Sequence, residues 1–154
     1  DELFIPDAPF DLVLALDVIE HLRDPGVFLR HVRRVTVPGG WFIATVPAFR
    51  ALWTAHDDLN AHVTRFTRAE LSALVRAYGF EVVHARYFFV LLAVAKLAVR
   101  TLESVRRPVP RAPGVPAAAI NAALQAICRA EQALLGRRAP WIGSSLLLVA
   151  RAAR

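Results

Sequence analysis

Three side chains that can do acid–base chemistry stand close together near the start of the chain: Asp17, Glu20 and His21. They follow an apolar run at residues 11–16 that is typical of a buried strand. Ligands of open α/β sheets gather at the carboxyl ends of strands, so we expect these side chains at a binding site. An imidazole titrates near neutral pH, which makes His21 a candidate general base. The alternative is that Glu20 and His21 only fix the loop and cap the next helix.

A second polar group lies in the irregular stretch 48–66 and contains His56, Asp57, His62 and Arg65. His62 and Arg65 could position a hydroxyl or an anionic group of a ligand. The alternative is a set of loop hydrogen bonds. His56 and His62 lack a third ligand in a zinc-site spacing, so we do not predict a zinc site.

The elements that must position these residues alternate between strands and helices. Asp24-Pro25 predicts the start of a helix, with Asp24 as N-cap, and Pro38-Gly39-Gly40 predicts its end. Thr67 and Glu70 form a capping box that opens another helix, which Gly79 ends. Strands are predicted from the apolar runs at residues 11–16, 41–46, 80–89 and 143–150.

Two further helices are predicted at 87–102 and 117–135, with an irregular, proline-rich linker at 106–116 between them. The second helix is expected to turn one apolar face inward: Ile120, Leu124, Ile127 and Leu134. The order β-α-β-loop-α-β-α-α-β predicts an α/β fold whose first two strands are parallel. A strand as apolar as 11–16 is expected to have neighbours on both sides.

Charge is divided unevenly along the chain. Residues 1–60 hold five basic and nine acidic residues, whereas residues 61–154 hold fourteen basic and four acidic residues. The arginines are not interleaved with aromatic residues, so we expect no nucleic-acid partner. A single cysteine, Cys128, excludes an intrachain disulfide framework. We expect a cytoplasmic protein, with peripheral membrane contact left open.

The membrane alternative rests on residues 87–111. This segment is apolar at its start and contains four arginines in its second half, which could bind an anionic lipid surface: Arg100, Arg106, Arg107 and Arg111. It is too short and too charged to predict a membrane span. The favoured interpretation is a helix packed on the sheet.

Several of these segments, taken in order, resemble class I S-adenosylmethionine-dependent methyltransferases of types 11 and 12. The stretch from Phe10 to Pro25 is similar to the fourth strand and following loop of that family. Pro38-Gly39-Gly40 resembles its turn into strand five. His62 to Thr67, Glu70-Leu71 and Tyr78-Gly79-Phe80 resemble the approach to strand six, and Gly143 to Ala150 resembles the antiparallel seventh strand.

The resemblance implies a Rossmann-like methyltransferase sheet made of strands four to seven with flanking helices, and strands one to three are missing. Residues 1–154 would then be the carboxy-terminal part of one domain, with a helical insertion at about 90–136 before the last strand. The glycine-rich loop after strand one and the acidic residue after strand two, which hold the cofactor in that family, have no counterpart here. We therefore expect weak cofactor binding by these residues alone.

The resemblance also assigns roles to residues. The cofactor would be S-adenosylmethionine, with Asp1 at its adenine and Asp17 and Val18 at its methionine end. His21 would be the base and His62 would position the acceptor. His56 and Arg65 would bind the substrate. In some quinone O-methyltransferases the pattern that Asp17, Glu20 and His21 match resembles a metal site, but we expect no metal and keep that set as the alternative.

The predicted function is methyl transfer to an unidentified small-molecule acceptor, and a hydrophobic or lipid-linked acceptor is one of the options. The alternatives are a truncated, non-catalytic fragment and a membrane-surface or lipid-binding module that uses residues 87–111. The methylated atom and the oligomeric state stay open.

Overall fold

The computed structural model describes residues 9–106, 117–136, 138 and 140–154. The predicted alternation of elements is confirmed. The strands are β1 (Phe10–Leu16), β2 (Thr36–Pro47), β3 (Phe80–Phe88) and β4 (Ser145–Ala152). The helices are α1 (Pro25–Val35), α2 (Ala55–Leu59), α3 (Arg68–Ala77), α4 (Val90–Arg106) and α5 (Ala118–Leu135), with short 3-10 turns η1 (Ile19–His21) and η2 (Arg50–Leu52).

The strands form one mixed sheet in the order β1-β2-β4-β3. β1 pairs in parallel with β2, as the predicted crossover through α1 requires. β4 pairs antiparallel with both β2 and β3, so the last strand of the chain lies between two earlier ones. This arrangement brings the carboxyl ends of β1 and β2 beside the start of β4.

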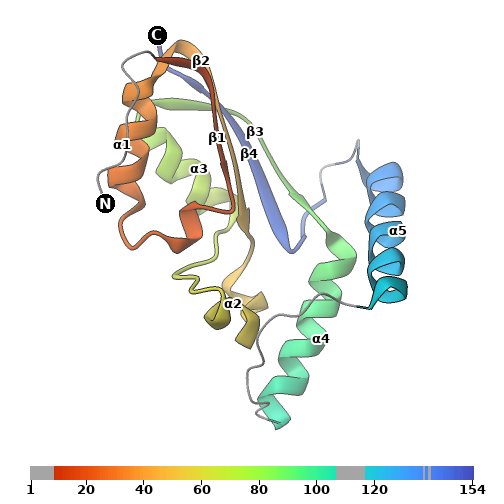
Figure 1. Ribbon diagram of the computed structural model, residues 1–154. Helices are drawn as coiled ribbons and strands as arrows, with labels where there is room; N and C mark the ends of the chain where they lie inside the picture. The colour runs from red at the N-terminus through yellow and green to blue at the C-terminus, as the bar shows by residue number, and fades with distance from the viewer. Residues whose placement is uncertain (1–8, 107–116, 137, 139) are drawn as a thin grey trace.

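Helices α1 and α3 lie on the same side of the sheet (Figure 1) and bury one of its faces. The core consists of apolar side chains from both layers: Leu29, Val32, Phe42, Ala44, Val46, Leu71, Val75, Leu146, Leu148 and Ala150. Burial follows every second residue of β2 and β4, as expected for strands covered on one face.

Both predicted helix starts are confirmed. The Asp24 carboxylate accepts a hydrogen bond of 2.9 Å from the Gly26 amide and Pro25 is the first helical residue. Thr67 and Glu70 cap the first turn of α3 reciprocally. Gly79 follows α3 with φ +82°, a left-handed conformation that ends the helix.

The predicted end of the first helix was wrong. α1 ends at Val35 and β2 begins at Thr36, so Pro38-Gly39-Gly40 lies within β2, next to an irregular step in its pairing with β1. At this point the Thr36 hydroxyl donates to the Val32 carbonyl over 2.6 Å and occupies an acceptor of the last helical turn. Three β-branched residues in a row at this point favour extended backbone over further helix.

β1 is a strand as predicted, but it lies at the edge of the sheet. Its one neighbour among the described residues is β2. Four apolar side chains of β1 are exposed: Phe10, Leu12, Leu14 and Leu16. The expectation of neighbours on both sides is therefore not met within the described part of the chain.

The two late helices do not pack on the sheet as predicted. α4 contacts η2 and α5 and extends away from the sheet (Figure 1). On α5 the apolar residues expected to face inward are exposed, with Ile120 at 57% and Leu134 at 75%. The buried residue of α5 is instead Glu131, whose carboxylate accepts from the amides of Val90 (2.7 Å) and Leu91 (2.9 Å). The Glu131 carboxylate accepts hydrogen bonds from the free amides at the start of α4, and its negative charge interacts favourably with the positive end of the α4 dipole. This contact therefore fixes the position of α5 against α4.

No helix in the described residues is long and apolar enough to cross a membrane. The irregular linker predicted at 106–116 lies almost entirely outside the described residues.

Glu131→Ala tests the contact that joins the helices. It leaves two amides at the start of α4 without acceptors, and we expect a loss of about 1–3 kcal/mol in unfolding free energy. Hydrogen exchange at Val90 and Leu91 should become faster. Gln132→Ala, one residue on and exposed, is the control. Unchanged protection of both amides in Glu131→Ala would contradict this account.

Candidate functional site

A polar cleft of about 440 Å³ lies at the end of the sheet where β1 and β2 finish and β4 begins. Among the described residues, the lining consists of Asp17, Glu20, His21, Pro47, His56, Asn60, His62, Arg65, Lys96, Ser144 and Ser145. The structure thus brings together Asp17, His21 and the three predicted residues of the later loop. Val18 is exposed and is not part of the lining, and Asp1 lies outside the described residues.

Asp17 occupies the first position after β1 and has a left-handed backbone, φ 53°. Its amide donates to the backbone oxygen of Thr45 (3.0 Å) and to the Thr45 hydroxyl (3.1 Å), and that hydroxyl bonds the Asp17 carboxylate (3.1 Å). A non-glycine residue in this conformation is strained and needs such support. The bonds to β2 hold the Asp17 carboxylate at the mouth of the cleft.

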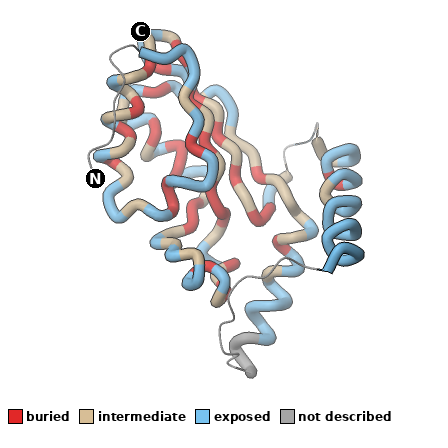
Figure 2. Tube along the Cα trace, in the orientation of Figure 1, coloured by how far each residue is buried: buried red, intermediate tan, exposed pale blue. Residues whose placement is uncertain are grey.

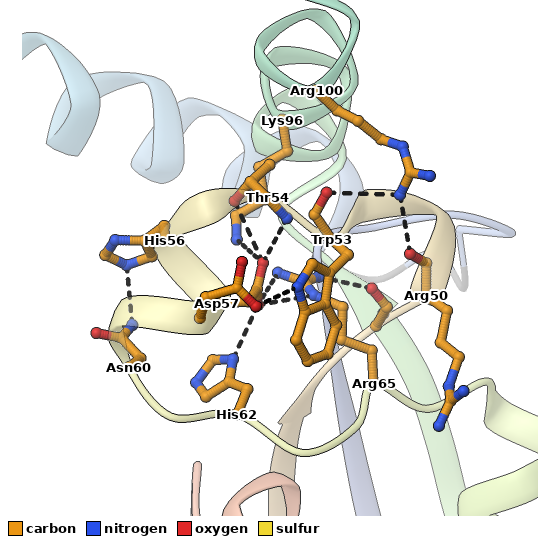
Figure 3. A network of polar contacts seen from close by, with 12 residues as sticks. Arg50, Trp53, Thr54, His56, Asp57, Asn60, His62, Arg65, Lys96 and Arg100 are labelled. Atoms are coloured by element: carbon orange, nitrogen blue, oxygen red, sulfur yellow. Dashed lines mark hydrogen bonds and ion pairs between the residues drawn. The ribbon is translucent and has the colours of Figure 1, made fainter. Parts of the chain in front are cut away.

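The carboxylate of Asp57 is the centre of a buried network (Figure 3). It accepts from the Thr54 amide (2.9 Å), from Arg65 Nε (2.9 Å) and from His62 Nδ1 (2.8 Å). Lys96 Nζ from α4 lies 4.0 Å from its second oxygen. Burial acts to raise the pKa of Asp57, but the hydrogen bonds from Thr54, Arg65 and His62 outweigh it and the pKa is lowered.

Arg65 is almost fully buried and its guanidinium is directed inward. Besides Asp57, it donates from NH1 to the carbonyl of Ala48 over 2.8 Å, just past the end of β2. Its hydrogen bonds therefore join the loop to the sheet. This placement favours a positioning role for Arg65 over the direct substrate contact that the sequence suggested.

His62 and His21 meet edge to face, with ring centroids 4.8 Å apart. Because an ionised Asp57 accepts at Nδ1, His62 carries its hydrogen there and leaves Nε2 for another partner. His21 is exposed on the cleft side, whereas His62 is largely buried. His56 lies at the rim, where its Nε2 is 3.0 Å from the Asn60 side-chain amide.

Glu20 is fully buried, and neither of its carboxylate oxygens has a hydrogen-bond partner. Its backbone oxygen, by contrast, accepts from Val63 (2.7 Å) and Thr64 (3.3 Å), which brings the His62 loop against His21. Burial raises the pKa of Glu20 to about 7, and the nearby carboxylate of Asp17 adds to the effect. An acid titrating near neutrality inside a cleft is typical of functional sites.

The residues that could hold a metal ion differ from the set considered on sequence. One ligand atom each from Glu20, His21 and His62 lie within 4.8 Å of one another. Asp17 is not in this group, and His62 takes its place. Metal–ligand bonds of about 2.0–2.2 Å require closer ligands, so a bound ion would need these three side chains to move together.

Sequence reasoning missed several members of the cleft. Asn60, Ser144 and Ser145 carry no motif that would single them out. Lys96 had a usable signal, because it is the only lysine of the chain and stands within an apolar helix. Its place beside Asp57 explains why a charge interrupts that apolar sequence.

The profile of a family described as a methyltransferase domain matches residues 2–85, more than half of the sequence. The chain belongs to the methyltransferase domain family. The matched part contains β1, the cleft residues from Asp17 to Arg65, and most of β3. The predicted family and its Rossmann-like α/β fold are thereby confirmed.

Curated relatives carry consistent names. A probable S-adenosylmethionine-dependent methyltransferase of Mycolicibacterium smegmatis is 40% identical over 83 residues, which are 53% of this chain and 32% of the relative. A ubiquinone biosynthesis O-methyltransferase of Caulobacter vibrioides is 54% identical over 39 residues, 25% of this chain and 16% of the relative. The chain spans about a third or less of the length of these relatives.

Solved structures share the fold at low identity. The methyltransferase in a Haloferax volcanii complex with the Trm112 methyltransferase activator has a TM-score of 0.55 and 19% identity, over 100% of this chain and 59% of that one. A Haemonchus contortus phosphoethanolamine N-methyltransferase in complex with S-adenosyl-L-methionine has a TM-score of 0.53 and 14% identity, over 94% of this chain and 34% of that one. At these identities the likeness concerns the fold alone.

Asp57→Asn tests the centre of the network. It removes the charge that pairs with buried Arg65, and we expect the unfolding free energy at pH 7 to fall by about 3 kcal/mol. Asp58→Asn, the same change at the exposed neighbour, should cost less than about 0.5 kcal/mol. Urea denaturation gives both values. Equal losses in the two variants would show that Asp57 does not hold the loop.

Glu20→Gln tests the unpartnered acid. Since its folded pKa of about 7 lies above the unfolded value, Glu20 stabilises the fold fully below pH 4.5 and loses this contribution as pH rises through about 7. The variant cannot ionise, so its advantage over the wild type should grow from pH 4.5 to about 7, by up to about 3 kcal/mol, and then stay constant.

Thermal or urea unfolding from pH 4.5 to 8 measures this difference. Glu81→Gln, at an exposed glutamate of β3, is the matched control. A pH-independent difference between Glu20→Gln and the wild type would contradict the assigned titration.

Proposed function

We propose that this domain transfers a methyl group from S-adenosylmethionine to a hydroxyl or amine of a small-molecule acceptor. The observation that carries the proposal is the position of the polar cleft in a chain of the methyltransferase domain family: it lies at the carboxyl ends of β1 and β2, where open α/β sheets bind ligands. The relatives named as S-adenosylmethionine-dependent support the choice of methyl donor.

The cofactor would lie with its sulfonium toward the residues that follow β1. When bound, S-adenosylmethionine supplies an activated methyl group on a positively charged sulfur. The Asp17 carboxylate, held at the mouth of the cleft by Thr45, attracts that charge. Val18 would contact the methionine part from its exposed position, and Asp1 remains a proposal for the adenine.

His21 is the residue we assign as proton acceptor. The donor would give up its methyl group to the acceptor oxygen or nitrogen and leave as a neutral thioether, and the His21 imidazole would take the proton that the acceptor loses. Buried Glu20 lies beside this imidazole and can compensate its positive charge. His62, anchored by Asp57, orients the acceptor, and His56 at the rim contributes to its binding. Most of the rate would come from alignment of the two reactants.

The acceptor is proposed as a partly apolar molecule. An apolar pocket of about 240 Å³ lies beside α4 and η2, and its lining includes Phe49, Leu52, Val94 and Leu97. Phe49 follows β2 closely, so this pocket adjoins the chain segment that ends at the cleft. A hydrophobic portion of the acceptor would fit there, with its reactive group in the polar cleft.

The main alternative is that the chain is a non-catalytic fragment. Titration with S-adenosylmethionine in a calorimeter separates the two, applied to this chain and to any longer product of the same reading frame. Binding in either supports the methyltransferase. Heat in neither favours the non-catalytic alternative.

His21→Gln tests the assigned base. With tritium-labelled S-adenosylmethionine and a panel of catechol, phenol and amine acceptors, we expect methyl transfer to fall by about 10²-fold, because general-base assistance is lost. His84→Gln, at an exposed histidine of β3, should leave the rate unchanged. Equal rates in wild type and His21→Gln at all pH values would remove His21 from this role, and a rate restored by added divalent metal would favour the Glu20, His21 and His62 metal site instead.

A further inference from the structure

The helices α4 and α5 present apolar side chains to solvent on an unusual scale. Figure 2 shows both helices as mostly exposed, away from the buried body of the sheet. On α4, Leu91, Val94 and Leu102 are each more than half exposed. On α5 the same holds for Ile120 and Leu134, and Trp141, which follows α5, is 87% exposed. We call α4, α5 and residues 140–142 the helical arm.

The exposed residues of α4 form a stripe with a definite direction. Leu91, Val94 and Leu102 follow the spacing of one helix face. The opposite face holds Ala93, which is buried, and Lys96, which is partly exposed and lies beside Asp57. Arg100 extends from that same face and donates to the carbonyl of Arg50 over 3.2 Å. The cationic face of α4 therefore binds the body of the domain, whereas Leu91 and Leu102 on the opposite face are directed away from it. Val94 lies at the edge of that face and also borders the apolar pocket beside η2.

Charge in this part of the chain is strongly one-sided. Residues 89–144 hold eight basic and two acidic residues, which equals the whole net charge of +6. Of the two acidic residues, Glu131 of α5 is buried against the first residues of α4. Among the arm's described side chains none that is exposed is acidic. Arg129 is exposed on the face of α5 opposite Ile120, and Arg138, which follows α5, is exposed as well.

We propose that the helical arm binds the surface of an anionic lipid bilayer. Exposed leucine, isoleucine and tryptophan side chains insert at the level of the headgroups, Arg138, three residues before Trp141, meets lipid phosphates, and the net positive charge of residues 89–144 adds to the attraction. Apolar surface of this extent is rare on monomers without a partner. The arm lies on the surface and does not cross, since no helix in the described residues can span a bilayer.

Charge complementarity selects the bilayer over a second copy of the chain. Two arms packed together would bring two segments of net positive charge into contact, and no exposed acidic side chain in the described part of the arm would pair with them. An anionic bilayer covers the apolar stripe and offsets the excess positive charge at the same time. The proposal does not depend on methyl transfer, which is assayed with water-soluble acceptors.

Vesicle flotation tests the proposal. We expect the wild-type chain to float with vesicles of 70% phosphatidylcholine and 30% phosphatidylglycerol, and to do so less in high salt. Vesicles of phosphatidylcholine alone should retain much less protein. Absence of flotation with the anionic vesicles, or equal flotation with both compositions, would overturn the proposal.

Two sets of variants assign the binding to the arm. Leu102→Glu combined with Leu134→Glu should weaken binding by about tenfold or more, since apolar contact is lost and negative charge is added. Val83→Glu, at a similarly exposed apolar residue of β3, is the matched control. Arg138→Gln should weaken binding by about fivefold. Arg129→Gln, on the face of α5 opposite the apolar stripe, and Arg76→Gln on α3 should have less effect.

Circular dichroism and thermal unfolding confirm that each variant is folded before its binding is compared. Light scattering of the free chain gives its mass. A dimer that the double glutamate variant converts to a monomer, without vesicle binding by the wild type, would show that a second copy covers the arm. Binding that persists in both arm variants would place the lipid contact elsewhere and refute the assignment.

Discussion

The buried carboxylate of Asp57 holds the loop that closes the cleft, and the other polar contacts of the site depend on it. Its partners Thr54, His62 and Arg65 are spread over the loop between β2 and α3. Arg65 also bonds Ala48, which joins the loop to the end of β2. The position of the His62 ring is therefore set by the same charge that stabilises the fold, so stability and site geometry cannot be changed independently at this carboxylate.

Glu20 shows the opposite outcome for a buried acid in the same cleft. Both carboxylates are removed from water, but that of Asp57 accepts hydrogen bonds from Thr54, His62 and Arg65, whereas that of Glu20 accepts none. The pKa of Asp57 is consequently lowered and that of Glu20 is raised to about 7. The fold uses only the backbone oxygen of Glu20, to hold Val63 and Thr64. A side chain that costs stability and has no structural partner is best explained by a role in the cleft.

Local signals in the sequence were sufficient to predict the order of strands and helices and the residues at which two helices begin. Asp24 and the pair Thr67 and Glu70 are capping residues whose partners lie within three positions, so they marked helix starts correctly. The residues after β1 were placed at a site because the end of a strand has a fixed meaning in an α/β sheet. The network around Asp57 could not be derived in this way, since its geometry depends on Ala48 and Lys96, which are distant in sequence and meet only after β2 and α4 are placed.

The orientation of α5 shows where the helical pattern stops being informative. Periodicity identifies Ile120, Leu124 and Ile127 as one apolar face, but it does not say what covers that face. The contact that decides is electrostatic: Glu131 lies on the same side of the helix and meets the free amides of Val90 and Leu91. Because a carboxylate at a helix start is strongly directional, this contact can hold α5 while its apolar face stays open. An apolar face that the fold leaves open, in a segment with nearly all exposed charge positive, is better matched to an anionic surface than to the interior of the domain.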